Sequence, residues 1–134
     1  MSQENVEIVR RFLDGAHENP DAVWDIFDEG VVWEIGPLRV PDLPATSRGP
    51  DEVREFFRRW AGSFEDWGFE AEEPVPIGRN GVVVRIEQWG RGKGSGARVD
   101  LRFWEAWDMR DGKAIRVTHH YEKADALDDI GTSD

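Results

Sequence analysis

The chain of 134 residues has a formal net charge of −11 and no cysteine, and this length suits one domain with a modest core. The acidic balance disfavours nucleic acid and anionic membranes as partners, because phosphate binding needs clustered Lys and Arg. The lack of cysteine excludes disulfides and thiolate chemistry. No apolar run approaches the roughly 20 residues of a membrane span, and the polar N-terminus has no signal-peptide segment, so we expect a cytoplasmic protein.

Three segments of the first half predict helices. Residues 4–17 carry apolar side chains at helical spacing. An Asn-Pro pair is a helix-start signal and predicts a short helix over residues 21–27. A Gly-Pro-Asp-Glu sequence opens a third helix at residue 49. The apolar stripe of this third helix is typical of a core face and could also roof a cavity; it comprises Val53, Phe56, Phe57, Trp60 and Phe64.

A strand and a loop are predicted between the second and third helices. Residues 31–35, Val-Val-Trp-Glu-Ile, read as a short strand. Residues 36–47 contain three prolines and predict a loop without regular structure. Loops of this length in compact domains are often functional. A lid over a pocket mouth and a tolerated insertion both remain open as interpretations.

The period of the pattern changes to two in the second half. Residues 69–77 predict a strand that two prolines place at an edge or break. Residues 82–89 predict a clear strand with Arg85 and Glu87 on one face. The glycine-rich stretch 90–96 lacks the phosphate-loop pattern and predicts a flexible hairpin connection.

A long hairpin is predicted over residues 97–121, around an Asp-Gly turn at 111–112. Alternation along its first strand places on one face Val99, Leu101, Phe103, Glu105 and Trp107. The same face of its second strand should carry Ile115, Val117, His119 and Tyr121. Each apolar face therefore contains one ionisable residue. A short terminal helix over 122–130 should follow.

This order of elements predicts an α+β domain. A strongly curved antiparallel sheet packed against three N-terminal helices would leave a cone-shaped cavity. Because neither a repeat nor a linker divides the chain, we expect a single domain over residues 1–134.

Several stretches resemble the nuclear-transport-factor-2-like (NTF2-like) superfamily and, within it, the SnoaL-like, polyketide-cyclase-like group. The matching stretches are residues 1–16, 31–34, 48–53 and 90–96, Trp107 with the turn 110–113, and residues 124–127. The resemblance covers almost the whole chain. It implies a cone-shaped barrel and a small apolar or polyketide-, steroid- or terpenoid-like ligand, without a cofactor. The superfamily includes ketosteroid isomerases, polyketide cyclases, epoxide hydrolases, dehydratases and members with no known activity, so the fold does not settle the function.

Limonene-epoxide-hydrolase-like members of that superfamily use an Arg-x-Asp on a central strand and a second Asp late in the sheet. Here Arg85 and Glu87 match Arg-x-acid, and His119 falls near the second Asp. By this resemblance Arg85 would orient Glu87, and His119 would shuttle a proton. The Tyr and Asn that help to hold the water are replaced by Trp33 and Ile35, which disfavours epoxide hydrolysis.

Two other chemistries of the superfamily bear on the hairpin. Ketosteroid-isomerase-like proton transfer needs a carboxylate base near the first strand, where this chain has Ile35, and acidic donors, for which Tyr121 and Glu105 are candidates. Cyclase-like chemistry needs one acid/base residue late in the sheet. His119 is the natural candidate because imidazole titrates near neutral pH, and Glu105 would orient it or share its proton.

These patterns predict a small-molecule-binding protein with an aromatic-lined pocket and a cofactor-free acid/base site of cyclase, isomerase or hydrolase type. The predicted catalytic residues are His119, Glu105, Glu87 and Arg85. The predicted substrate contacts are Trp33, Ile35, Phe57, Trp60, Phe103, Trp107 and Tyr121. The alternative is a non-catalytic ligand-binding or accessory protein in which the same residues form core and ion pairs.

Three further points concern the two faces of the predicted sheet. His119 and His120 point to opposite faces, so one enters the pocket: His119 by the alternation, or His120 if the register is shifted by one. We expect no metal, because only one histidine can face any one site. The resemblance implies a homodimer through the outer sheet face, where Trp104 would fit the interface.

Overall fold

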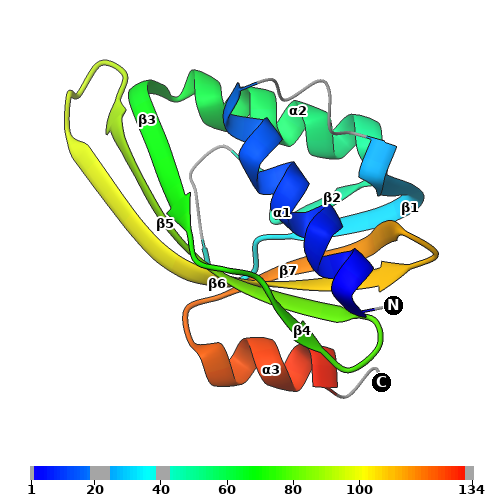
Figure 1. Cartoon of the computed structure of the whole chain (residues 1–134). Coiled ribbons are helices and arrows are strands. Elements are labelled where there is room, and N and C mark those ends of the chain that lie inside the picture. The colour runs from blue at the N-terminus through cyan, green and yellow to red at the C-terminus, as the bar shows by residue number, and fades with distance from the viewer. Residues whose placement is uncertain (1, 19–24, 39–42, 132–134) are drawn as a thin grey trace.

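A computed structural model describes residues 2–18, 25–38 and 43–131 of the chain. Helices and strands segregate along the sequence as expected, and the fold is α+β (Figure 1). In chain order the elements are α1 (Ser2–Glu18), β1 (Phe27–Glu34), β2 (Thr46–Arg48), α2 (Gly49–Gly62), β3 (Phe64–Ala71), β4 (Val75–Ile77), β5 (Gly81–Gly92), β6 (Arg98–Arg110), β7 (Lys113–His120) and α3 (Lys123–Gly131).

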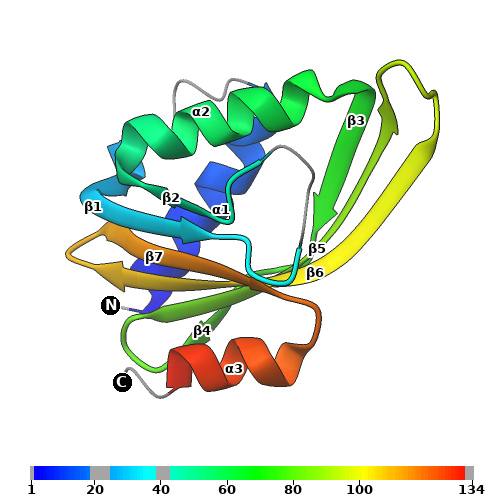
Figure 2. The same ribbon diagram turned by 180° about the vertical axis from the view of Figure 1, so that it is seen from behind.

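The strands of these described ranges form one curved sheet in the order β2-β1-β7-β6-β5-β3, with β4 also paired to β5. Helices α1 and α2 lie in the hollow of the curve, and α3 lies on the other side of the sheet, as both views show (Figures 1 and 2). The end strands β2 and β3 do not pair within these ranges, so the sheet is an open cone. This confirms the predicted fold class.

The β6–β7 hairpin confirms the predicted turn. Arg110 pairs with Lys113, and the two residues between them, Asp111 and Gly112, have φ angles of 51° and 77°. Both angles lie in the left-handed region that an Asp-Gly pair tolerates and that matches the twist of a two-residue hairpin. The turn sets the first pairs of the hairpin, and a register shift before Met109 then offsets the remaining pairs of β6 and β7 by one residue.

An aromatic cluster fills the space between the helices and the concave face. The Trp107 ring, which is fully buried on β6, lies 5.3 Å from the Phe12 ring of α1 and 6.2 Å from the Trp33 ring of β1. The Phe27 ring stacks on Trp107 at 6.1 Å. Each aromatic pair contributes about 0.5–1.5 kcal/mol beyond the burial of its area. The amphipathic faces of α1 and α2 are thus fixed against the sheet by large rings.

Several predicted boundaries in the N-terminal half are wrong. The helix expected over 21–27 falls mostly outside the described residues, and its last residue, Phe27, begins β1. Residues 46 and 47 of the expected loop belong to β2, which pairs with β1. Phe64, expected on a helix, begins β3. β1 also pairs with β7 in parallel, so the sheet is not wholly antiparallel. The residues at which such strands begin and end depend on pairing with neighbouring strands, and not on the local sequence alone.

Helix α3 covers part of the outer face of the sheet. Ala126 and Ile130 pack against Val83 and Ala106. Trp104, expected at a subunit interface, packs against this same cluster, with the Lys123 ammonium 5.4 Å from its ring. The tryptophan therefore contacts the chain's own helix.

A polar cluster ties α3 to β7. The Asp129 carboxylate accepts hydrogen bonds from the Thr118 hydroxyl at 2.5 Å and from Arg116 at 2.8 Å, and His120 Nε2 lies 3.0 Å away. Burial raises the pKa of Asp129, but the hydrogen bonds from Thr118, Arg116 and His120 outweigh burial and hold this pKa below its ordinary value. The ionised carboxylate therefore stabilises the docked helix.

We expect Asp129→Asn to lower the free energy of unfolding by about 1–2 kcal/mol at pH 7, because charge-assisted hydrogen bonds are lost. Since the folded-state pKa of Asp129 is depressed, its contribution is full above the ordinary carboxyl pKa, roughly 4, and is lost as pH falls through the folded-state value. Urea unfolding between pH 7 and 3 should therefore show a smaller acid-induced loss in the variant than in the parent.

The exposed Asp111→Asn variant is the control, because asparagine tolerates the same left-handed turn. Its free energy of unfolding should stay within about 0.5 kcal/mol of the parent. An identical pH slope for the parent and Asp129→Asn would refute the role given to this carboxylate.

Candidate active site

The centre of the candidate site is a buried pair, Glu105 on β6 and His119 on β7. The two residues sit directly opposite each other in the antiparallel register, so their side chains share the concave face. His119 Nε2 lies 3.0 Å from Glu105 Oε2, and only 4% and 6% of the two side chains are exposed. The predicted pairing of these two residues is therefore what the hairpin produces, and His119, not His120, is the inward histidine.

Further hydrogen bonds orient both members of the pair. The indole Nε1 of Trp107 donates to Glu105 Oε1 at 3.0 Å. His119 Nδ1 lies 2.7 Å from the backbone carbonyl oxygen of Glu34 on β1. A carbonyl oxygen only accepts, so Nδ1 must carry a hydrogen. Three strands thus fix the imidazole and the carboxylate.

This arrangement requires a proton between the two side chains. With Nδ1 protonated, a neutral imidazole has a lone pair at Nε2, and that lone pair would face the lone pairs of an ionised carboxylate. A hydrogen bond at 3.0 Å therefore needs a proton on His119 Nε2 or on Glu105 Oε2. Either form leaves the pair with no net charge, which lowers the cost of burying it.

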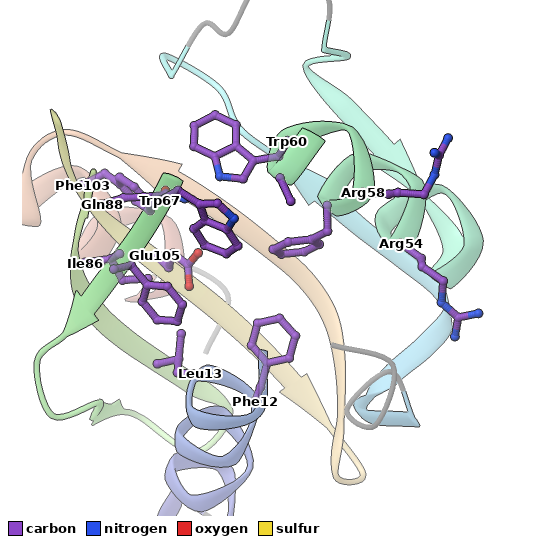
Figure 3. A pocket seen from close by; sticks show the side chains of 13 residues that line it. Phe12, Leu13, Arg54, Arg58, Trp60, Trp67, Ile86, Gln88, Phe103 and Glu105 are labelled. Carbon is purple, nitrogen blue, oxygen red and sulfur yellow. The ribbon is translucent and has the colours of Figure 1, made fainter. Parts of the chain in front are cut away.

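A largely apolar cavity of about 370 Å³ opens beside Glu105. Figure 3 shows the Glu105 carboxylate among the aromatic rings that line it, with Arg54 and Arg58 pointing away. The lining comes from both helices and three strands: Phe12, Leu13, Arg54, Phe57, Arg58, Trp60, Ala61, Trp67, Phe69, Ile86, Gln88, Phe103 and Glu105. Glu105 and Gln88 are the polar side chains that the sheet contributes to this wall.

A smaller hollow of about 60 Å³ adjoins this cavity. The two spaces share Glu105, Gln88, Phe57, Trp60 and Phe103, so they lie on either side of the same groups. His119 lines only the small hollow, where its ring lies 4.9 Å from the Trp33 ring. Glu105 therefore connects the large apolar space with the histidine.

The expectation that Arg85 and Glu87 share the face of Glu105 is wrong. In the β5–β6 register Arg85 pairs with Trp104 and Glu87 with Arg102, so both point to the outer face. There Arg85 Nη2 lies 3.1 Å from Glu87 Oε1, within a network of surface ion pairs. From β5 it is the even-numbered Ile86 and Gln88 that line the cavity. Because neighbouring residues of a strand point to opposite faces, a shift of one residue exchanges the two faces.

The predicted substrate contacts divide into two groups. Five of them line the large cavity, the small hollow or both: Trp33, Ile35, Phe57, Trp60 and Phe103. Trp107 does not line either space, and it lies behind Glu105 as its hydrogen-bond donor. Tyr121 is 49% exposed and follows the end of β7, so its predicted contact is wrong.

Sequence reasoning missed the walls contributed by α1 and β3. Phe12 and Leu13 line the cavity from α1, and Trp67 and Phe69 line it from β3. The helical stripe of α1 could have identified the first pair as inward-facing. Gln88 was missed because the face of β5 was reversed.

The described part of the chain offers neither a cluster of metal ligands nor a membrane-spanning helix. The residues in ranges 2–18, 25–38 and 43–131 contain no group of three His, Asp or Glu side chains placed to hold a metal ion. Among the helices in these ranges, none is long and apolar enough to cross a membrane.

The fold is that of an NTF2-like α+β domain, and comparisons with known proteins agree with this fold. The SnoaL-like domain family matches residues 9–117, so the chain belongs to that family. This confirms the resemblance found in the sequence. A search of curated proteins gave no match.

Solved structures show the same fold. TerC co-crystallised with polyporic acid is 21% identical, with a TM-score of 0.75 over 96% of this chain and 98% of TerC. Bal32a from a soil-derived mobile gene cassette is 18% identical, with a TM-score of 0.79 over 96% of this chain and 97% of Bal32a. An NTF2-like protein of unknown function from Burkholderia pseudomallei is 22% identical, with a TM-score of 0.73 over 93% and 95%. At these identities the likeness concerns the fold alone.

We expect Glu105→Ala to lower the free energy of unfolding by about 3 kcal/mol or more, because it leaves the buried Trp107 N–H and His119 Nε2 without the carboxylate that they share. Glu105→Gln should cost less than about 1 kcal/mol. Its amide oxygen can accept from Trp107, and its NH₂ can donate to His119 Nε2. Urea unfolding measures both values. Equal destabilisation by the two variants would contradict the hydrogen-bond pattern described for the pair.

Proposed function

We propose that this protein binds a small apolar, ring-containing molecule in the large cavity and moves a proton on it with the Glu105–His119 pair. The chemistry is that of a cofactor-free isomerase or cyclase. The observation that carries the proposal is a buried pair that must hold a proton, placed in the wall of an apolar cavity of about 370 Å³. That volume lies within the roughly 300–1,000 Å³ typical of small-molecule sites.

The reaction follows from the two forms of the pair. With the proton on His119, the Glu105 carboxylate can accept a proton from a carbon next to a ligand carbonyl. The pair then carries one positive charge, which offsets the negative charge of the enolate that forms. Return of a proton to a different carbon gives an isomer. Attack of the enolate carbon on a second carbonyl gives a ring, and the alkoxide that results takes its proton from the pair.

The chemistry of the walls supports a ligand of the polyketide-, steroid- or terpenoid-like class. The rings of Phe12, Phe57, Trp67 and Phe69 offer flat apolar surface on several sides. The co-crystal of the fold relative TerC with polyporic acid is consistent with an organic ligand in such a domain. Exclusion of water by these walls would strengthen the electrostatic interactions of the pair.

Epoxide hydrolysis receives less support than isomerisation or cyclisation. The Arg85 and Glu87 side chains face outward, so they cannot form the expected set with His119. Trp33 and Ile35 replace the residues that hold the attacking water in the enzymes that the sequence resembles.

A non-catalytic ligand carrier is the second candidate. It is favoured by the fact that both Glu105 oxygens and both His119 nitrogens already have partners within the chain. In that case the pair would only hold β6, β7 and β1 together. Proton exchange on a bound ketone separates the two functions.

A homodimer and a cytoplasmic location remain predictions. For the dimer, the outer face of β5 and β6 next to α3 offers charges of both signs, Arg85, Glu87 and Arg102. A surface of mixed sign can complement a second copy of itself.

We expect the protein to accelerate hydrogen–deuterium exchange at the α-carbon of 2-tetralone, an enolisable bicyclic ketone. The exchange is measured in D₂O by proton NMR. Glu105→Gln should reduce the accelerated rate by about 100-fold or more, because the carboxylate base is removed while its hydrogen bonds are kept. Tetralone binding should persist in this variant.

Glu70→Gln is the matched control, since it neutralises an exposed carboxylate on β3; it should exchange at the parent rate. Bound tetralone that exchanges no faster than in buffer would favour the carrier. A loss caused by Glu87→Gln and absent in Glu105→Gln would overturn the assignment of the base.

A further inference from the structure

Two tryptophans of the small hollow have an unused donor. Among the side chains of the described residues, the indole Nε1 atoms of Trp33 and Trp60 are buried and have no hydrogen-bond partner. The two residues are 3% and 7% exposed. Buried polar groups are satisfied in the great majority of cases, and an unsatisfied one costs about 1–3 kcal/mol. Two unsatisfied indole donors in residues of the same hollow therefore need a physical explanation.

Both indoles line the same small hollow, together with Glu105 and His119. Trp33 reaches it from β1 and Trp60 from α2, so the donors come from opposite layers of the domain. The remaining lining is mostly apolar and includes Ile35, Leu38 and Leu101. Two side chains that each carry an unsatisfied N–H therefore border the hollow, beside the proton of the pair.

The size of the hollow limits what it can hold. A volume of about 60 Å³ is too small for a ring system, whereas a single oxygen-bearing group fits. The adjoining cavity of about 370 Å³ has room for the rings. Trp60 and Glu105 line both spaces, so a molecule can lie in the large one and extend a polar end into the small one.

We propose that the indole N–H groups of Trp33 and Trp60 bind an acceptor oxygen of the ligand, a carbonyl or enolate, in the small hollow beside Glu105 and His119. This inference rests on the proposed function, because it assumes a ligand in the large cavity. The two tryptophans then determine both orientation and specificity. The ligand presents its oxygen to β1 and α2, and the carbon next to that oxygen lies by the Glu105 carboxylate.

An indole can donate and cannot accept, so this site selects against certain ligands. A hydrocarbon of the same shape leaves both donors unsatisfied. An ammonium group at the same place brings further donors to a site that needs an acceptor. The hollow therefore favours ketones and their enolates over hydrocarbons and amines.

The test compares 2-tetralone with tetralin, the hydrocarbon of the same ring skeleton, by ligand-observed NMR titration of the full chain. The parent should bind the ketone more tightly than the hydrocarbon. Trp33→Phe and Trp60→Phe should each weaken ketone binding about 3- to 10-fold, the value of one net hydrogen bond. Tetralin binding should change less, so the ratio of the two dissociation constants falls.

Trp67→Phe is the control, because it makes the same change in the large cavity and does not line the small hollow. It should affect the two probes by the same factor. The ratio of dissociation constants is insensitive to general loosening of the fold, which would weaken both probes together.

Three outcomes would overturn the proposal. If neither probe binds the parent, the proposed function fails and this inference fails with it. If both probes bind but the parent shows no preference for the ketone, only the role of the tryptophans fails. The same holds if the preference survives both Trp33→Phe and Trp60→Phe.

Discussion

The hydrogen bond between His119 Nε2 and Glu105 Oε2 depends on a proton, and the surrounding structure depends on that bond. Because His119 Nδ1 is committed to the Glu34 carbonyl, the imidazole has one nitrogen left for the carboxylate. Because Trp107 occupies the other carboxylate oxygen, Glu105 cannot turn away. The strands β1, β6 and β7 are thereby joined at one buried point. There Glu105 and His119 share a proton next to an apolar cavity.

The two faces of the sheet use charge in opposite ways. On the concave face the neutral Glu105–His119 pair lies among aromatic rings, so its proton is little screened by water. On the outer face Asp129 ties α3 to β7 through Thr118 and Arg116, and the other ion pairs there are more exposed and contribute little. Strands β6 and β7 contribute side chains to both faces, because neighbouring residues of a strand, such as His119 and His120, point in opposite directions. The β6–β7 hairpin therefore lines the candidate site on one face and binds α3 on the other.

Much of the fold could be predicted from the sequence because its signals are local. The Asp-Gly turn located the β6–β7 hairpin, and alternation along each strand placed Glu105 and His119 on an inner face. A register shift between Asp108 and Met109 then brings these two residues opposite each other. The face of β5 was not predictable, because its connection to β6 is long and rich in glycine and does not define a register. Arg85 and Glu87 were misplaced for that reason. β2 escaped notice because its three residues form a strand only through pairing with β1. The wall from β3 depends on packing between distant segments, which no local pattern reveals, whereas the helical stripe of α1 does indicate its inward face.

Nitrogen-15 and proton NMR of the His119 side chain tests the central claim most directly, because it locates the protons of the pair in the free protein. We expect a hydrogen on Nδ1 and a downfield proton resonance from the bond between Nε2 and Glu105, and this resonance should vanish in Glu105→Gln. A neutral imidazole with its hydrogen on Nε2 and none on Nδ1 would contradict the account, because the Glu34 carbonyl would then face a lone pair. The pair would no longer need the proton on which the proposed chemistry depends.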